Sequence, residues 1–415
     1  MKHSLALKSQ LKLNYCKVLQ MLPFSSKVIG PPKGYATDIK EYVESYNSRK
    51  PSHPHTFWDF GKGSYTVPHP KKIWGNTDPV EEEVCHYHDF VVSLHKGRLI
   101  SIPYSVISND DVLLSELSDS VDTPAALNPI FFHHRLPKTM YLKGKAFVLG
   151  TLKDDNNYAH WLTEVLPKLH LLEQANIDLN EIDHFLLRTY RSGFVKEHLA
   201  YLGIPEEKIR IIDDKIASER DLTKATNSSP YWHVEADELI VTSVFWKPEC
   251  WMGDYLKKLY LEEQKSPIQI FDRIYVRRHK TNGRNVVNEE NLLNVLKKFG
   301  FAIIEAEKYT QKEKALLFNR AKVVVAPHGA GMANLIFCEP NTQVLELRAK
   351  GHSSYIIDEF RQLCAALQLD FSLFICKGVG VPSQYNTGAN LDLMVDVEAF
   401  ESMLSELLES EYMKK

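Results

Sequence analysis

The stretch VVVAPHGAGMANLIF, residues 323–337, decides the fold. Its run of valines is typical of a strand buried on both faces, and Pro327 marks the end of that strand. The turn that follows, Gly329 to Gly331, carries almost no side chains, and an apolar helix is expected from Met332 onward. A strand that passes through glycines into a helix indicates a Rossmann-like unit. There a ligand can approach main-chain N–H groups at a helix N-terminus, which favours negative charge.

The glycine turn by itself has two interpretations, which the sequence leaves open. It is either a tight turn between strand and helix or a cradle for a phosphate or diphosphate. The dinucleotide fingerprint GxGxxG is incomplete, because Asn334 stands where its third glycine would be, and no GK[ST] follows as in a P-loop. NAD and ATP bound in those two ways are therefore disfavoured.

Strands and helices alternate on both sides of the glycine turn, in one block over residues 140–245 and another over residues 265–378. Such alternation, with nearly continuous apolar strands, predicts parallel sheets covered by helices on both faces. We therefore predict an α/β fold with two Rossmann-like domains that face a cleft. Ligands are expected at the carboxyl ends of the strands.

The individual elements follow from hydrophobic periodicity and turn residues. The expected strands are 145–150, 184–188, 208–212, 238–245, 273–278, 301–306, 322–327, 343–348 and 371–377. The expected helices are 157–175, 194–203, 254–264, 288–300, 310–321, 354–368 and 397–413.

The N-terminal part of the chain has a different composition. Residues 30–80 are rich in Pro, Gly, Lys and His and predict an irregular lead-in, and residues 84–107 predict a β-hairpin or meander that turns at HKG. The predicted organisation is a β-rich, loop-heavy extension, two domains and a tail with an amphipathic helix. Their borders are 1–83, 84–250, 265–378 and 379–415.

Composition narrows the functional class. With 44% hydrophobic and 25% charged residues, the 415-residue chain resembles ordinary globular proteins, and a net charge of −3 provides no basic field for nucleic acid. Six cysteines without a CxxC pair are typical of a reducing compartment. No segment is long and apolar enough to span a bilayer, and the lysine-bearing N-terminus suits an ordinary first helix or a weak surface anchor. We predict a cytoplasmic protein, with peripheral attachment to the membrane left open.

A basic cluster follows the strand predicted at 273–278. Arg277 and Arg278 end that strand, and Arg284 comes after a turn with Asn282. Guanidinium groups bind phosphate oxygens in pairs of hydrogen bonds, so the cluster is a candidate anion site; a solvated charged loop is the alternative. Neighbouring residues of a strand point to opposite faces, although both arginines can reach the crevice from the strand's end.

A strand acid and a helical histidine complete the candidates. Glu346 ends the strand after the glycine turn, where a carboxylate can accept hydrogen bonds from ribose hydroxyls. In the helix expected at 157–175, His160 and Glu164 are four residues apart and share one face, as a general base and the group that orients it would. The alternatives are a core histidine bonded to a local glutamate, or zinc, for which HxxxE lacks further ligands.

Three segments together resemble glycosyltransferase family 61, formerly domain of unknown function 563, in its bacterial type. They are NNYAHWLTEVLPKLHLL, YVRRHKTNGRNVVNEENLL and VVVAPHGAGMANLIFCEPNTQVLEL, in the family's order within residues 90–378. The resemblance implies a GT-B fold, with the acceptor in the N-terminal domain and a UDP-sugar in the C-terminal one. It also implies inverting transfer in the biosynthesis of capsular or surface polysaccharides, and no cofactor. The absence of any Asp-x-Asp suits metal-independent catalysis.

The resemblance assigns roles residue by residue. His160 and Glu164 match a His-Trp-x-x-Glu-type motif and are the expected base or acceptor-positioning pair. The expected donor-binding residues are Arg277, Arg278, Arg284, His328, Gly329, Ala330, Gly331, Asn334 and Glu346. The arginines would hold the diphosphate, His328 would contact phosphate or sugar, and the acceptor would be a glycan or a lipid-linked glycan. A sugar-nucleotide epimerase of the same fold and a non-catalytic subunit that binds nucleotide or glycan remain as alternatives.

Overall fold

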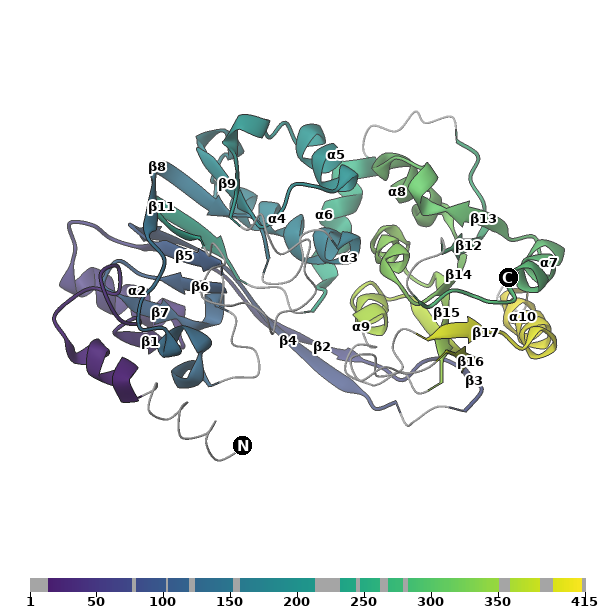
Figure 1. Cartoon of the computed structure of the whole chain (residues 1–415). Helices are drawn as coiled ribbons and strands as arrows, with labels where there is room; N and C mark the ends of the chain where they lie inside the picture. The colour runs from purple at the N-terminus through teal and green to yellow at the C-terminus, as the bar shows by residue number, and fades with distance from the viewer. Residues whose placement is uncertain are drawn as a thin grey trace. The chain divides into compact units, whose positions relative to one another are not determined.

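The computed structural model shows a mixed α/β protein with two sheets, as predicted (Figure 1). Contact clustering divides the chain into a first unit, residues 1–62 and 88–244, and a second unit, residues 63–87 and 245–415. The structure describes residues 14–76, 80–101, 104–118, 124–151, 157–212, 232–243, 247–261, 268–278, 283–350, 359–380 and 391–412. The predictions for residues 1–13, 244–245, 262–264, Asn282 and 354–358 lie outside these ranges.

The first unit is built on a ten-stranded sheet in the order β1-β7-β6-β5-β11-β8-β9-β10, with β4 also paired to β11 and β2 paired to β4. Its strands are β1 (Gly34–Ala36), β2 (Thr56–Val67), β4 (Glu83–His95), β5 (Arg98–Ser101), β6 (Tyr104–Ile107), β7 (Val112–Leu114), β8 (Thr139–Val148), β9 (His184–Leu187), β10 (Ile209–Ile211) and β11 (His233–Thr242). The border between the two units falls inside β2 and inside β4.

The alternating block, residues 140–245, forms parallel strands as predicted, but the sheet as a whole is mixed because earlier strands join it. Strands β11, β8, β9 and β10 are parallel, but β4 and β5 both pair antiparallel with β11. The hairpin predicted at HKG is also wrong. Chain segments on either side of Lys96 and Gly97 continue along the same edge of β11, with Lys96 N–H bonded to Asp237 O (2.9 Å) and Ala236 N–H to Gly97 O (3.2 Å).

Two crossovers connect the parallel strands of the first unit. Between β8 and β9 run α3 (Tyr158–His160), η4 (Trp161–Val165) and α4 (Pro167–Gln174), and between β9 and β10 runs α5 (Gly193–Tyr201). The predicted helices 157–175 and 194–203 are thus confirmed. The first crossover leaves the carboxyl end of β8, which is where the His160 pair lies.

The lead-in predicted as irregular contains a missed helix, α2 (Ile39–Arg49). Asp38 caps this helix by accepting a hydrogen bond from Glu41 N–H (2.8 Å). Tyr42, Tyr46 and their aliphatic neighbours on the helix join the core of the sheet. The residues on either side are rich in Pro, Gly and His and are typical of loops, so this capped amphipathic helix was not predicted.

The second unit contains a seven-stranded sheet in the order β13-β12-β14-β15-β16-β17, with β3 paired to β16. These strands are β3 (Ile73–Trp74), β12 (Arg273–Arg277), β13 (Ala302–Glu305), β14 (Val323–Pro327), β15 (Gln343–Ala349), β16 (Asp370–Val379) and β17 (Asp392–Met394). All pairs are parallel except β16 with β17. The strands predicted after residue 270 are confirmed.

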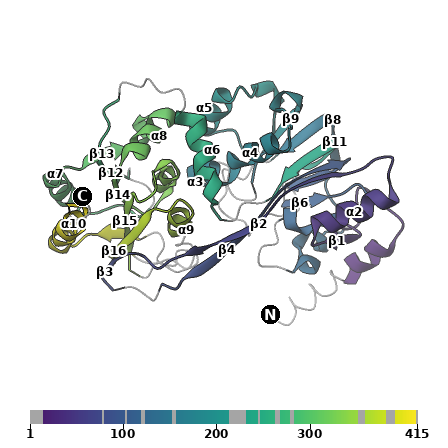
Figure 2. The same ribbon diagram turned by 180° about the vertical axis from the view of Figure 1, so that it is seen from behind.

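Helices cover both faces of the second sheet (Figures 1 and 2). On one side α7 and α10 share a core with β14 and β15. On the other side α6, α8, η10 and α9 pack together. Their bounds are α6 (Cys250–Leu261), α7 (Glu289–Lys298), α8 (Gln311–Arg320), η10 (Ala330–Phe337), α9 (Glu359–Ala366) and α10 (Val397–Tyr412). None of the helices that the structure describes is long and apolar enough to cross a membrane.

The strand order places a switch point between β12 and β14. The five strands β12 to β16 stand in the order second-first-third-fourth-fifth, which is the flavodoxin-like order of doubly wound sheets. Their connections therefore leave β12 and β14 in opposite directions. Open α/β sheets bind ligands beside the carboxyl ends of the strands at this point. Arg278 follows β12 and His328 follows β14, so both stand there.

Candidate active site

Arg278 lies against the glycine turn. Its Nη1 donates to His328 O over 3.4 Å, and a Cβ atom placed on Gly329 would lie 1.9 Å from the same nitrogen. A side chain at position 329 would therefore displace the guanidinium group. The glycine is required at this place because a cation approaches the main chain so closely.

Arg278 and Arg284 form a pair of desolvated cations. Burial, followed by the charge of Arg284, lowers the pKa of Arg278 to about 10. Burial also lowers the pKa of Arg284, although Glu359 and Glu346 oppose this effect. Arg284 has a left-handed backbone (φ 63°), and its buried Nε makes no hydrogen bond to any residue described. Two desolvated cations in one half-buried region favour an anion beside them.

Arg277 points elsewhere. Its Nε and Nη2 bind Glu289 Oε2 at 2.9 and 2.8 Å, at the start of α7. Adjacent residues of a strand alternate between faces, so Arg277 and Arg278 separate as expected. The diphosphate role of Arg277 remains a prediction, and in the structure its guanidinium group is bound to a carboxylate.

His328 belongs to a buried polar cluster with Glu346 and Arg348. His328 Nδ1 lies 2.8 Å from Glu346 Oε1, while Arg348 donates from Nε to Oε1 and from Nη2 to Oε2, both over 3.0 Å. Burial alone raises the pKa of Glu346, but Arg348 and His328 outweigh it and lower the pKa to about 2. Both oxygens of this fully buried carboxylate already accept hydrogen bonds. A ribose hydroxyl that binds Glu346, as predicted, must therefore share a carboxylate oxygen with His328 or Arg348.

The turn itself presents main chain. Asn334 is fully buried and donates from Nδ2 to Gly331 O (3.0 Å), so it braces the turn from within. A Cβ atom on Gly331 would lie 3.2 Å from Val276 Cγ1, which explains the small residue. The short helix from Ala330 is 3₁₀ rather than α. The first N–H groups of any helix lack partners within it, and here they belong to small residues, Ala330 and Gly331.

His160 and Glu164 are brought together in the first unit. His160 Nδ1 lies 2.7 Å from Glu164 Oε1, and both side chains are largely buried. Asn157 caps the helix by accepting from Ala159 N–H (2.9 Å). The imidazole is thus oriented by a carboxylate, as the sequence predicted. Within the described part of the chain, no three His, Cys, Asp or Glu side chains gather as a metal site requires.

The pair lies on a π-helical turn that the sequence analysis did not predict. Leu166 N–H bonds to Trp161 O (3.0 Å), five residues back, immediately before Pro167. A proline inside an α-helix lacks the N–H group and clashes with the carbonyl four residues earlier, and the wider turn accommodates both defects. Pro167 was the sequence signal from which this π-helical turn could have been predicted. Such turns are often found at functional sites.

Two further polar residues were missed. Arg348 lies two residues after Glu346 and hence on the same face of β15, so strand alternation could have identified it as a partner. Lys168 is buried on α4 and donates from Nζ to Val148 O (3.4 Å), at the end of β8, and to Gly150 O (2.6 Å), two residues further on. Its position four residues after Glu164 was the only signal.

Comparison with known families gives one match. Residues 158–345 match the family model described as Glycosyltransferase 61. No curated protein matches the chain. The matched range includes His160 and Glu164 in the first unit and the arginines and glycine turn in the second, and it ends one residue before Glu346. This match agrees with the family resemblance seen in the sequence: residues 158–345 are similar to the glycosyltransferase 61 family.

Proposed function

We propose that the protein is an inverting glycosyltransferase that uses a UDP-sugar and a glycan acceptor. The observation that carries this proposal is Arg278, whose guanidinium group lies against the turn at Gly329 at the switch point of the second sheet, with Arg284 near enough for its charge to act on it. Desolvated cations, main-chain N–H groups and a helix start suit the diphosphate of a nucleotide-sugar. The family points to sugar transfer as the use of that diphosphate.

The proposed reaction is a single displacement. An acceptor hydroxyl attacks the anomeric carbon, the bond from that carbon to the diphosphate oxygen breaks, and UDP leaves with the electron pair. Negative charge grows on the leaving oxygen, so Arg278, Arg284 and the turn N–H groups bind the transition state more strongly than the ground state. Because fixed cations take this part, the proposal requires no divalent metal.

The acceptor hydroxyl must lose its proton to a base. With Nδ1–H of His160 donating to Glu164, Nε2 is the atom that takes the proton, and no residue described in the structure bonds to it. The carboxylate then stabilises the imidazolium that forms. In the alternative assignment Glu164 is itself the base and His160 positions the acceptor. Both assignments belong to the proposal.

A donor screen tests the proposed function directly. UDP-sugars, but not GDP- or CMP-sugars, are expected to raise the Tm of the purified protein, because ligands that bind the folded state stabilise it. Transfer to an acceptor is expected to continue in excess EDTA. Loss of turnover in EDTA would disprove the metal-independent mechanism. Isomerised donor in reactions without acceptor would indicate an epimerase, and UDP binding without donor consumption a non-catalytic subunit.

We further propose that the enzyme acts in the cytoplasm at the inner face of a membrane, on a lipid-linked or surface-polysaccharide glycan. The first 37 residues contain six lysines and no Asp or Glu, although the whole chain has a charge of −3. In the described part of this segment, several large apolar side chains are exposed, Met21 by 86%. They are Tyr15, Val18, Met21, Phe24, Val28 and Tyr35. A basic segment with exposed apolar side chains suits an anionic lipid surface.

Vesicle flotation tests the membrane proposal. The protein is expected to float with vesicles of phosphatidylglycerol and phosphatidylcholine and to remain behind with phosphatidylcholine alone. Membrane binding is expected to need both the basic charge and the exposed apolar side chains. The double variant Met21→Asp, Phe24→Asp should therefore lose flotation, while its donor-induced Tm shift persists. Equal flotation of this variant and the wild type would overturn the proposal. Replacement of the exposed Met394 of the second unit by Asp is the matched control.

A further inference from the structure

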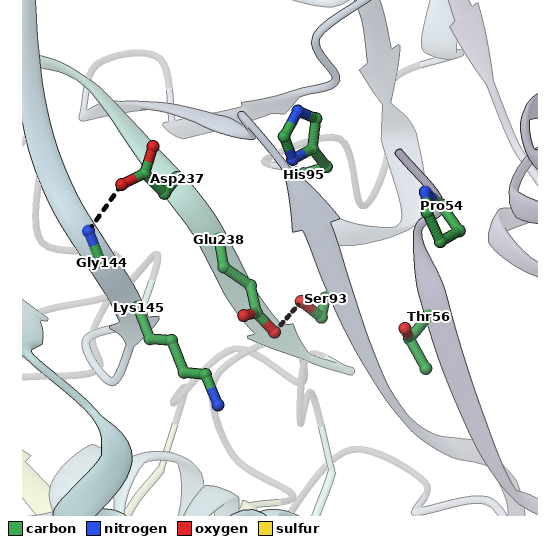
Figure 3. A pocket seen from close by; sticks show the side chains of 8 residues that line it. All are labelled: Pro54, Thr56, Ser93, His95, Gly144, Lys145, Asp237 and Glu238. Carbon is green, nitrogen blue, oxygen red and sulfur yellow. Dashed lines mark hydrogen bonds between the residues drawn. The ribbon is translucent and has the colours of Figure 1, made fainter. Parts of the chain in front are cut away.

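A polar cavity of about 350 Å³ lies within the first unit, apart from every residue discussed above as a donor ligand or base. Strands β2, β4, β8 and β11 provide its walls (Figure 3). The lining residues are Pro54, Thr56, Ser93, His95, Gly144, Lys145, Asp237 and Glu238. Its volume falls near the lower end of the range for small-molecule sites, roughly 300–1,000 Å³.

The cavity lies where a β-bulge interrupts the pairing of β8 with β11. The register pairs Ala236 with Leu142 and then Glu238 with Lys145, so β8 has one residue more than β11 over this step, next to Gly144. On the other edge of β11, strands β4 and β5 keep one register on both sides of Lys96 and Gly97. Bulges re-aim side chains and are common beside functional sites.

Hydrogen bonds fix the acidic side chains of the cavity. Asp237 Oδ2 accepts from Gly144 N–H (2.9 Å) and its other oxygen from the Tyr141 hydroxyl. Glu238 Oε1 accepts from the Ser93 hydroxyl (2.6 Å), as Figure 3 shows. Its second oxygen accepts no hydrogen bond from the residues described. The acceptors are therefore held in place with one position left for a ligand.

Donors stand beside these acceptors. Lys145 pairs in register with Glu238 across β8 and β11, and its Nζ gives one hydrogen bond to Glu181 (2.7 Å), which leaves two N–H groups. The His95 ring stacks on His53 with centroids 4.6 Å apart. Burial and then His53 lower the pKa of His95, so its imidazole is neutral at neutral pH and offers one donor and one acceptor.

The charges of the cavity exclude some ligands. One lysine faces two carboxylates, so an anion such as a phosphate would be repelled. An apolar ligand would strip water from fixed polar groups without replacing their hydrogen bonds. A sugar ring fits both conditions, because each of its hydroxyls donates one hydrogen bond and accepts others. Neighbouring hydroxyls can thus bridge Glu238 and Lys145.

We propose that this cavity binds a neutral sugar unit of a glycan, as a holding site that is separate from the reacting centre. The identity of that glycan as acceptor or product rests on the proposed function. The cavity would hold one part of the glycan while another part of the same glycan reacts. It therefore contributes to affinity for the glycan and leaves the chemical step unchanged.

A glycan array probed with the labelled full-length protein, without donor, tests this proposal. Wild type is expected to bind a subset of neutral oligosaccharides, and both Glu238→Gln and Lys145→Met should weaken that binding about tenfold, the loss of roughly one charged hydrogen bond. The control Lys143→Met removes an exposed lysine of the same strand outside the cavity and should bind as wild type does. Absence of any bound glycan, or equal binding by all variants, overturns the proposal.

Kinetics separate this inference from the proposed function. With an acceptor identified, the two cavity variants should raise KM for the acceptor and leave kcat and donor hydrolysis unchanged. If the array shows cavity-dependent binding but no donor is consumed, the cavity proposal holds and the glycosyltransferase proposal fails. If donor is consumed while array binding and acceptor KM are the same in every variant, the glycosyltransferase proposal holds and the cavity proposal fails.

Discussion

Arg284→Gln is expected to lower kcat/KM for the donor by about 10²- to 10³-fold, comparable to the loss of one preorganised donor at a developing oxyanion. The same variant should be no less stable than wild type when no ligand is present. Folding lowers the pKa of Arg284, which means that its charged form is less favoured in the folded state than in the unfolded state. A neutral side chain of similar length removes that unfavourable interaction and keeps the left-handed backbone unchanged.

Thermal shift with and without UDP gives the measurement. Wild type should gain Tm from UDP, and Arg284→Gln should lose that gain while its unliganded Tm stays equal or rises. Gly329→Ala is the companion variant, because its methyl group would displace the Arg278 guanidinium group and should also weaken UDP binding. Arg320→Gln, at an exposed arginine, is the control. A full UDP response in both site variants would refute the assignment of the diphosphate site.

His160→Gln is expected to lower kcat by about 10²- to 10⁴-fold, the usual contribution of a positioned general base. The UDP-induced Tm shift should remain, because the residue belongs to the first unit and the proposed diphosphate ligands to the second. Single-turnover kinetics with saturating donor and acceptor report the chemical step. A variant with normal kcat would remove His160 from the reaction.

Glu164→Gln separates the two assignments of the base. Glutamine keeps an oxygen that accepts from Nδ1–H, so the imidazole stays oriented and only the charge is lost. If His160 is the base, this variant should lose much less activity than His160→Gln; if Glu164 is the base, it should lose as much. His170→Gln is the matched control, since His170 also lies beside a glutamate, Glu173, on the same crossover.

The second unit could be predicted from sequence almost element by element. Its strands are apolar on both faces and its helices amphipathic, so each element shows its own period. The order of the strands required the structure, because doubly wound sheets have more than one common order. Only the structure shows that Arg278, and not Arg277, lies at the glycine turn. Strand alternation predicts that the two side chains point to opposite faces, but not which of them faces the turn.

The first unit was less predictable, for a physical reason. Strand β11 pairs with β4 and β5, which precede it by more than 130 residues, and no local pattern records such a partner. The segment HKG was read as a hairpin turn because it contains a glycine and separates two strand-like runs. The polar cavity lies beside the bulge between β8 and β11, which no local pattern in the sequence records.

The second unit is built from two separate parts of the sequence, residues 63–87 and 245–415, which limits how it can be expressed or exchanged on its own. Strand β3 pairs with β16 at Leu373 and Phe374, and Arg361 donates to Pro68 O (2.9 Å), so the second unit includes residues 63–87 as structural parts. A fragment that begins at residue 245 would keep the arginines and the glycine turn yet expose part of an edge strand, which favours aggregation. The unit that carries the proposed nucleotide site is consequently not contiguous in sequence, and recombination that exchanged residues 245–415 as one gene segment would deliver an incomplete sheet.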